Sequence, residues 1–167
     1  MSLSNGIPAN IKQDKLYKDV CTEVAINSSA TPNFSIDIKL QIGNQTELAL
    51  MFFCNSMGVN YKDLRPSDRI VKVKPFSSDR KCMSTVYKKD NGKLVLYVKG
   101  APEILINQCK YYLSETGEPQ LITESWLANF HKNVLGTLGY KSARGILTCR
   151  VDLPSDFDVN DHDVYDF

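Results

Sequence analysis

Hydrophobic residues recur along the chain with two different spacings, and each spacing predicts a type of element. Residues 11–27 carry Leu16, Val20 and Val24 at intervals of four, which predicts an amphipathic helix. Residues 34–42 alternate apolar and polar side chains, which predicts a strand with one wet face. The chain therefore begins with a helix followed by a strand.

A mostly apolar helix is predicted next, over residues 45–57. Asn44 suits its N-cap, and Glu47 stands three residues later, at the second position of a capping box. Residues 70–74 alternate again and predict a second strand. Pro75 has no N–H to donate, so this strand ends there or lies at a sheet edge.

A β-hairpin is predicted from residues 82–89 and 94–99, because Asn91–Gly92 lies between these two apolar runs. Asn-Gly is the strongest short hairpin signal, since a type I′ turn needs positive φ at both central positions. A two-residue loop here sets the facing pairs, which are Asp90 with Lys93, Val86 with Tyr97 and Ser84 with Lys99. The hairpin brings Lys99 close to Lys81 at the entry of its first strand.

The remaining elements are predicted as a helix over residues 101–113, a turn over 114–119, a helix over 123–138 and a strand over 146–151. The buried stripe expected for the second of these helices is Trp126, Leu127, Phe130, Val134 and Leu138. Residues 152–167 are acidic and predict a linker or loose tail. The mixed order of elements favours an α+β fold, in which an antiparallel β-sheet is flanked by helices.

Composition narrows the function classes. The 167 residues suffice for one domain with a real core, and the formal net charge is only +1. A net charge near zero, with no basic stripe in the sequence, argues against a nucleic-acid binder. No apolar run approaches the roughly 20 residues of a membrane-spanning helix. The five cysteines are scattered without a C-x-x-C, so neither a disulfide framework nor a zinc site is indicated.

Common nucleotide motifs are absent from the sequence. There is no G-x-x-x-x-G-K-[ST] for a P-loop and no G-x-G-x-x-G for a Rossmann or kinase glycine loop. His131 and His162 have no partner at a spacing that suits a metal or a catalytic triad. Any nucleotide site must therefore be built in another way.

Three segments together point to a family. Residues 43–50 read GNQTELAL, residues 75–84 read PFSSDRKCMS and residues 99–103 read KGAPE. In this order and at these separations they resemble the nucleotide-binding (N) domain of P-type cation-transporting ATPases. The likeness extends from about residue 11 to about residue 154, and its wording is most similar to the plasma-membrane-type calcium-transporting ATPases.

The resemblance implies a nucleotide site. Phe76 matches the phenylalanine that stacks on adenine, and Glu47 matches the acidic residue near the adenine amino group. Lys81 and Lys99 match two lysines that line the cleft. The remaining matches are Gly100, where the backbone approaches the base, and Arg144, an arginine that reaches the phosphates.

Physical chemistry is compatible with these roles, although each residue also has an ordinary structural explanation. A purine needs a π-face, and stacking on an aromatic ring is worth about 1–3 kcal/mol. A carboxylate accepts from an exocyclic amine but not from a keto oxygen, so Glu47 could favour adenine over guanine. The alternatives are that Phe76 is a core residue and that Glu47 acts only as a capping-box partner. Lys81 and Lys99 could be solvated strand ends, and Arg144 a surface residue.

The resemblance also implies a division of the chain and a set of partners. We expect residues 1–6 to be an artificial leader, 7–154 to form the ATP-binding domain and 155–167 to be an acidic linker or tail toward the rest of a pump. The family's phosphorylated Asp-Lys-Thr-Gly motif is absent, so ATP should bind here without turnover. Mg²⁺ should be held mainly by a domain that this chain lacks.

The expected partners are ATP and the phosphorylation and actuator domains of the parent pump, with no nucleic acid and no direct membrane contact. The expected location is the cytosolic face of a membrane-embedded pump, with the fragment itself soluble. Two other hypotheses stay open. One is a non-enzymatic interaction module derived from such a domain, and the other is the equivalent domain of a pump for another cation.

Overall fold

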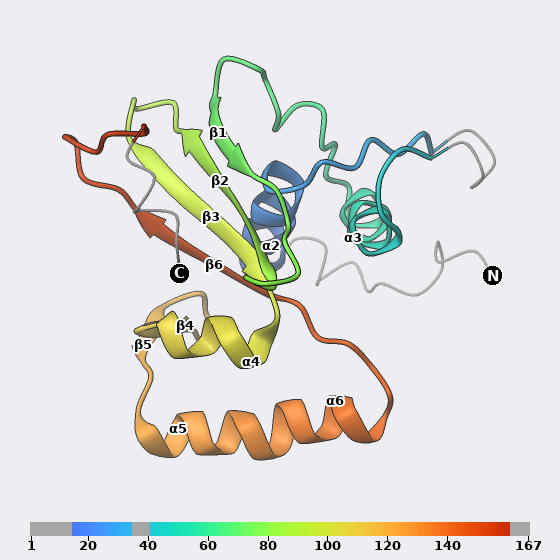
Figure 1. Cartoon of the computed structure of the whole chain (residues 1–167), viewed down its shortest axis with the longest axis vertical. Helices are drawn as coiled ribbons and strands as arrows, with labels where there is room; N and C mark the ends of the chain where they lie inside the picture. Colours follow the sequence, from blue (N-terminus) through green and yellow to red (C-terminus); the bar gives the residue numbers. More distant parts are fainter. Residues whose placement is uncertain (1–14, 35–40, 161–167) are drawn as a thin grey trace.

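A computed structural model describes residues 15–34 and 41–160 of the chain. Its centre is a four-stranded sheet in the order β1-β2-β3-β6, in which every neighbouring pair is antiparallel (Figure 1). The strands are β1 (Ile70–Lys74), β2 (Cys82–Lys88), β3 (Leu94–Gly100) and β6 (Leu147–Asp152). The α+β architecture predicted from the order of elements is confirmed.

Helices α2 (Lys15–Ile26) and α3 (Gln45–Ser56) pack together beside the sheet (Figure 1). Their shared core includes Cys21 and Val24 from α2 and Met51 and Cys54 from α3, all nearly inaccessible to solvent. Asn44 caps α3, because its side-chain oxygen accepts the Glu47 N–H at 2.8 Å. Both helices were predicted from their apolar spacing.

The two faces of the sheet have different partners because strand side chains alternate. Tyr87, Val95 and Tyr97 point to the side where Ile26 at the end of α2 packs. Leu96 and Val98 point the other way and pack with Leu105. The second face is also covered by Leu153, Phe157 and Val159, so the segment expected to be a loose tail packs on the sheet through Val159.

The β2–β3 hairpin forms as predicted, but its register is shifted by one residue from the prediction. Lys88 faces Leu94, and the Lys89 N–H donates to the Lys93 carbonyl at 2.8 Å. The loop therefore has three residues, with Gly92 at φ 78°, which is the alternative hairpin geometry with one left-handed residue. The observed pairs that replace the predicted ones are Val86 with Leu96, Ser84 with Val98 and Met83 with Lys99.

The single helix predicted over residues 101–113 is wrong in its second half. Helix α4 (Pro102–Leu105) and the 3₁₀ turn η3 (Ile106–Gln108) end early, and β4 (Tyr111–Leu113) pairs with β5 (Pro119–Leu121). Tyr-Tyr-Leu is a strand-favouring sequence, and Gly117 at φ 79° closes the turn. The pairing partner supplied by residues 119–121 therefore outweighed the helical pattern.

The last helix extends over α5 (Glu124–Asn129), the π-helical segment η4 (Phe130–Leu135) and α6 (Gly136–Tyr140). Thr123 caps it by accepting the Trp126 N–H at 3.2 Å. None of its residues is fully buried, and Val134 is exposed, so the predicted buried stripe is wrong in degree. The reason is that this helix lies against α4 and the β4–β5 hairpin and away from the four-stranded sheet (Figure 1). There Trp126 stacks between Tyr112 and Phe130.

Two predicted segments lie partly outside the described residues. These are residues 11–14 of the first helix and residues 35–40 of the predicted strand at 34–42. The described end of that strand includes Ile42, which forms an isolated antiparallel bridge with Thr31. Among the described residues, no helix has the length and apolar character needed to cross a bilayer.

Candidate functional site

The six residues singled out by the sequence gather at one end of the sheet, where β2 begins and β3 ends. Phe76 and Lys81 lie in the β1–β2 loop, in which the Lys81 N–H donates to the Ser77 carbonyl at 2.9 Å. The Lys81 carbonyl in turn accepts the N–H of Ala101, directly after Gly100, at 3.0 Å. The backbone therefore joins the loop to the end of β3.

Phe76 is 56% exposed, although it is one of the largest apolar side chains of the protein. The ordinary explanation, that it is a core residue, is therefore wrong. Lys81 is also exposed, and its backbone has a left-handed φ of 56°, which is uncommon for a lysine. Among the described residues, Lys81 has no acidic partner within ion-pair distance.

Gly100 is required by packing within this loop junction. A Cβ added there would lie 2.7 Å from the Cβ and 2.9 Å from the Cα of Cys82, and it would also collide with the Lys81 carbonyl oxygen. Separations below about 3 Å between such atoms lie well inside the optimal contact distance. The close approach that explains this glycine in the structure is thus one between two backbone segments.

Lys99 and Glu47 form a buried ion pair on the α3 side of the sheet. The Lys99 Nζ donates to Glu47 Oε1 at 2.5 Å and to the Asn27 carbonyl at 2.5 Å. Only 9% of the Lys99 side chain and 4% of the Glu47 side chain are exposed. Both ordinary explanations are therefore wrong. Lys99 is not a solvated strand end, and Glu47 is not only a partner of the N-cap, because its carboxylate forms the ion pair with Lys99.

Ser29 completes the coordination of the Glu47 carboxylate. Its hydroxyl donates to Oε2 at 2.6 Å and its backbone N–H donates to Oε1 at 3.3 Å. Burial alone would raise the pKa of Glu47, but the hydrogen bonds from Lys99 and Ser29 outweigh it and hold the pKa below the ordinary value. For Lys99, burial lowers the pKa and Glu47 opposes the shift. With the two groups 2.5 Å apart, each favours the charged form of the other.

Asn27 links this pair to the sheet and was missed by the sequence analysis. Its side-chain N–H donates to the Met83 carbonyl at 3.1 Å, and its Oδ1 accepts the Thr85 hydroxyl at 2.8 Å. It is 1% exposed, so both contacts are made away from water. No signal in the sequence marks Asn27, because it lies at the end of a helix, where an asparagine is common.

Arg144 lies in the loop between α6 and β6, at the same end of the sheet. The next residue, Gly145, is so close to the start of α4 that an added Cβ would lie 3.1 Å from Pro102 Cγ. Shortly beyond, Leu147 pairs with Gly100. Arg144 is exposed, and within residues 15–34 and 41–160 it has no acidic partner at ion-pair distance.

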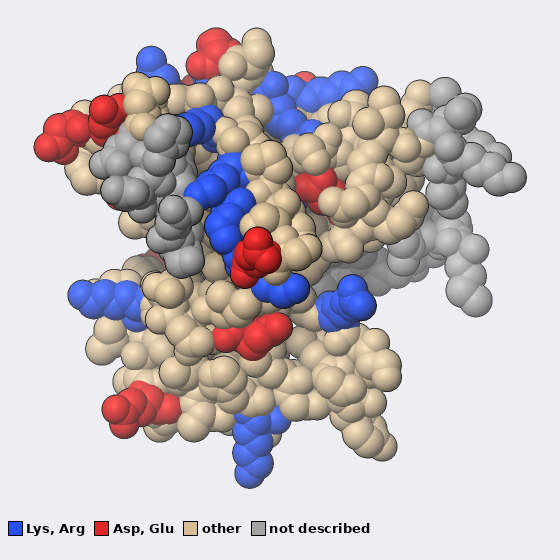
Figure 2. All heavy atoms as spheres, viewed as in Figure 1, with Lys and Arg blue, Asp and Glu red and all other residues tan. Residues whose placement is uncertain are grey.

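The charges on the surface are mixed. Figure 2 shows Lys and Arg atoms gathered in the middle of one face, over the sheet, with acidic side chains between them and the lower part of the molecule. The described residues include no cluster of three or more histidine, cysteine or acidic side chains that could hold a metal ion. The positive groups at the sheet end are therefore suited to an anionic ligand, and no metal centre is seen beside them in the described part of the chain.

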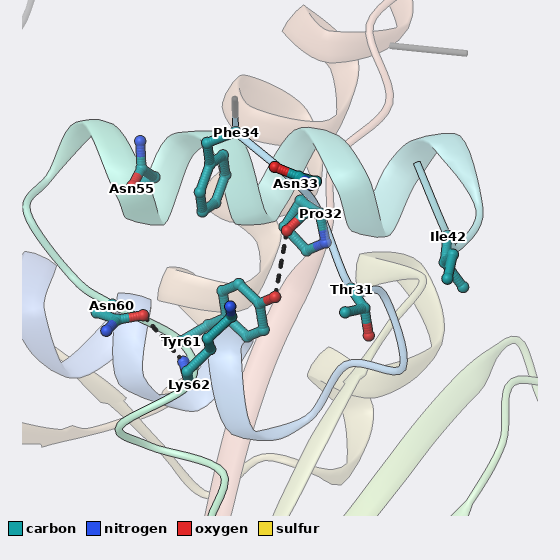
Figure 3. Close-up of a pocket in the computed structure, with 9 residues that line it drawn as sticks. All are labelled: Thr31, Pro32, Asn33, Phe34, Ile42, Asn55, Asn60, Tyr61 and Lys62. Carbon is teal, nitrogen blue, oxygen red and sulfur yellow. Dashed lines mark hydrogen bonds between the residues drawn. The ribbon is translucent and has the colours of Figure 1, made fainter. Parts of the chain in front are cut away.

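A separate cavity of about 500 Å³ lies beside α3, with Phe34, Asn55 and Tyr61 among its lining residues (Figure 3). In it, the Tyr61 hydroxyl donates to the Pro32 carbonyl at 3.2 Å, and the Phe34 ring makes edge contacts with Phe52 and Tyr61. None of the six site residues lines this cavity.

Comparison with known proteins gives a consistent family. Residues 17–166 match the family described as P-type ATPase, cytoplasmic domain N. The calcium-transporting ATPase PAT1 of Dictyostelium discoideum is 40% identical over 136 residues, covering 77% of this chain and 12% of that protein.

Two further relatives are plasma membrane calcium-transporting ATPases. Plasma membrane calcium-transporting ATPase 2 of Oreochromis mossambicus is 31% identical over 145 residues, which cover 82% of this chain and 13% of the relative. Plasma membrane calcium-transporting ATPase 1 of Gallus gallus is 31% identical over 158 residues, which cover 90% of this chain and 13% of the relative. The chain thus spans 12–13% of the length of these relatives.

Proposed function

Because this chain belongs to the family of cytoplasmic N domains of P-type ATPases, we propose that it binds ATP as part of a calcium-transporting pump. In the proposal, adenine lies against the Phe76 ring, and the phosphates face Lys81 and Arg144. Calcium as the transported ion is inferred from these relatives, which are calcium-transporting ATPases.

The single observation that supports this proposal best is the exposure of Phe76. Full burial of a phenylalanine side chain stabilises a protein by about 1.5–3 kcal/mol. Phe76 is 56% exposed, so it contributes only part of this energy to folding. An aromatic face on a loop is suited to stacking on a base, an interaction worth about 1–3 kcal/mol. The ammonium of Lys81 lies five residues later in the same loop and has no acidic partner among residues 15–34 and 41–160, so it is suited to a phosphate.

The buried pair of Lys99 and Glu47 has a different role in the proposal. An ammonium has three donors, and two of those on Lys99 are used by Glu47 and Asn27, so one is left for a ligand. Glu47 already accepts from Lys99 and Ser29, so an adenine amino group would have to use its remaining lone pair. We expect Glu47 and Lys99 to form the inner wall of the site, and the Gly100 backbone to lie at its edge.

In the whole pump, the N domain would present the γ-phosphate to an aspartate in a separate phosphorylation domain, on the cytosolic side of the membrane. That domain would also hold most of the Mg²⁺ coordination, and the actuator domain would be a further partner. The 167 residues contain no Asp-Lys-Thr-Gly segment, so the chain by itself should bind ATP without hydrolysing it.

The proposal is tested by titrating the chain with ATP and following backbone amide NMR shifts. Shifts should gather at Phe76, Lys81 and Gly100, and Phe76→Ala should weaken binding by about 5- to 150-fold, the equivalent of 1–3 kcal/mol. Tyr111→Ala is the matched control, because Tyr111 is 52% exposed in the separate β4–β5 hairpin.

Two results would contradict the proposal. One is an unchanged ATP affinity in a folded Phe76→Ala variant. The other is the absence of any shift at millimolar ATP, which would favour an interaction module that does not bind nucleotide. A preference for ATP over GTP that disappears in Glu47→Gln would support the adenine contact, whereas equal affinity of the unmodified chain for both nucleotides would count against it.

A further inference from the structure

Arg65 lies beside the buried Lys99–Glu47 pair. Its hydrogen bonds and ring contact among the described residues involve none of the six predicted site residues. Its guanidinium donates to two main-chain carbonyls, that of Ala25 through Nε and that of Ala30 through Nη1 at 2.7 Å. Its Nη2 lies 3.0 Å from the Met51 sulfur, and the guanidinium carbon, Cζ, lies 4.8 Å from the centre of the Tyr61 ring. One side chain therefore joins the end of α2, the start of the next segment and α3.

The guanidinium has no carboxylate partner within ion-pair distance in the part of the chain that the structure describes. Burial lowers the pKa of Arg65, and Tyr61 and Glu47 act in the opposite direction. A partly buried cation without an ionic partner is costly unless its donors are used. Here the Nε donor satisfies the Ala25 carbonyl in the last turn of α2, where the helix dipole also favours a positive charge, and Nη1 satisfies the Ala30 carbonyl in the segment that follows.

The segment held by Arg65, residues 25–30, carries the groups that hold the buried pair. Between the two carbonyls that accept from Arg65 lie Asn27, whose own carbonyl accepts from Lys99, and Ser29, which donates to Glu47. Met51 is one helical turn after Glu47 on α3. Arg65 thus contacts both ends of the segment and the helix that presents the carboxylate.

From these contacts we infer that Arg65 is a positioning residue of the nucleotide site, fixing residues 25–30 so that Asn27 and Ser29 hold the Lys99–Glu47 pair in place. The inference rests on the proposed function for its effect on ATP. Its effect on the pair itself can be observed without any nucleotide.

The test uses the full chain with Arg65→Met, which keeps a similar length but removes every donor. Arg69→Met is the matched control, because Arg69 is an arginine four residues away that pairs with Asp90 at the far end of the hairpin. The measurements are the NMR signals of the Lys99 side chain without nucleotide, and the ATP dissociation constant. We expect Arg65→Met to shift or broaden the Lys99 signals and to weaken ATP binding about 5-fold or more, and Arg69→Met to change neither.

A double-mutant comparison separates positioning from general loss of structure. If Arg65 acts through the pair, Arg65→Met should weaken ATP binding far less in a Lys99→Met background than in the unmodified chain. An equal loss in both backgrounds, or unchanged Lys99 signals in Arg65→Met, would overturn the inference.

Arg65→Lys retains the charge but cannot reach both carbonyls at once, so it should not restore binding. If Arg65→Met does not fold, Arg65→Lys takes its place in every comparison. ATP binding of Arg65→Lys equal to that of the unmodified chain would overturn the inference. If the unmodified chain binds no ATP, the proposed function fails, and the Lys99 signals alone still decide the role of Arg65.

Discussion

Removal of the Lys99 ammonium should destabilise the protein strongly, because it leaves a carboxylate buried without its ionic partner. Lys99→Met keeps much of the side-chain volume and removes the contact of 2.5 Å to Glu47. With only 9% and 4% of the two side chains exposed, solvent can replace little of the lost interaction. Breaking a buried pair on one side costs about 3–5 kcal/mol, a large part of the about 5–15 kcal/mol that stabilises a typical domain.

The pH dependence of this loss has a definite sign. In the unmodified chain the native pKa of Glu47 lies below its ordinary value of 4.5, so its contribution to stability is present above that pH and disappears as the pH falls through the lower native pKa. In Lys99→Met, burial is no longer opposed by the ammonium, and the native pKa of Glu47 should rise above the ordinary value. The stability deficit of the variant should therefore be largest at neutral pH and shrink as the pH falls.

The assay is urea denaturation followed by far-UV circular dichroism at neutral pH and near pH 4. Lys89→Met is the matched control, because the Lys89–Asp152 pair has a similar distance of 2.6 Å but exposed fractions of 36% and 69%. An exposed pair of this kind is worth only about 0–1 kcal/mol. The double variant Lys99→Met with Glu47→Gln should recover part of the loss at neutral pH. A Lys99→Met variant no less stable than Lys89→Met, or a deficit that does not change with pH, would refute the reasoning.

Two further predictions concern a packed glycine, compared with an open one, and a buried hydrogen bond. Gly100→Ala should destabilise the protein by about 1–3 kcal/mol, because the new methyl group would lie 2.7 Å from Cys82 Cβ. Gly139 lies in helix α6, and a Cβ added there would meet no neighbouring group within 4 Å. Gly139→Ala should therefore stabilise the protein by about 0.5–1 kcal/mol, and thermal unfolding of both variants checks the difference in sign. Thr85→Val should cost about 1–3 kcal/mol, because the buried Asn27 Oδ1 would lose the hydroxyl that donates to it at 2.8 Å. Equal urea midpoints for Thr85→Val and the unmodified chain would contradict that prediction.

The hairpin shows how far local sequence signals reach. Asn91–Gly92 predicted the turn and its two strands, and both form. The signal did not distinguish a two-residue loop from the three-residue loop that is observed, and a change of one residue alters every facing pair. Lys99 consequently faces Met83, and its side chain points to the α3 side, where it meets Glu47.

The helix predicted over residues 101–113 failed for a related reason. Its apolar pattern was compatible with a helix, but Tyr111–Leu113 could also pair with another strand, and the partner lies beyond the turn at Gly117. Short apolar runs are ambiguous between helix and strand, so the tertiary partner decides. Val134 became exposed in the same way, because the last helix covers a small hairpin and not the main sheet.

By itself the sequence determined the family, the antiparallel α+β sheet and the N-cap of α3, because these depend on local motifs and on the spacing of apolar positions. The six site residues it named stay a prediction. Only the tertiary structure decided that Glu47 and Lys99, 52 residues apart, share a buried ion pair, that Asn27 and Ser29 contact it, and that Arg65 binds both ends of the segment carrying those two residues. Hydrogen bonds between distant segments depend on register and packing in three dimensions, and neither is encoded in a pattern that can be read over a few neighbouring residues.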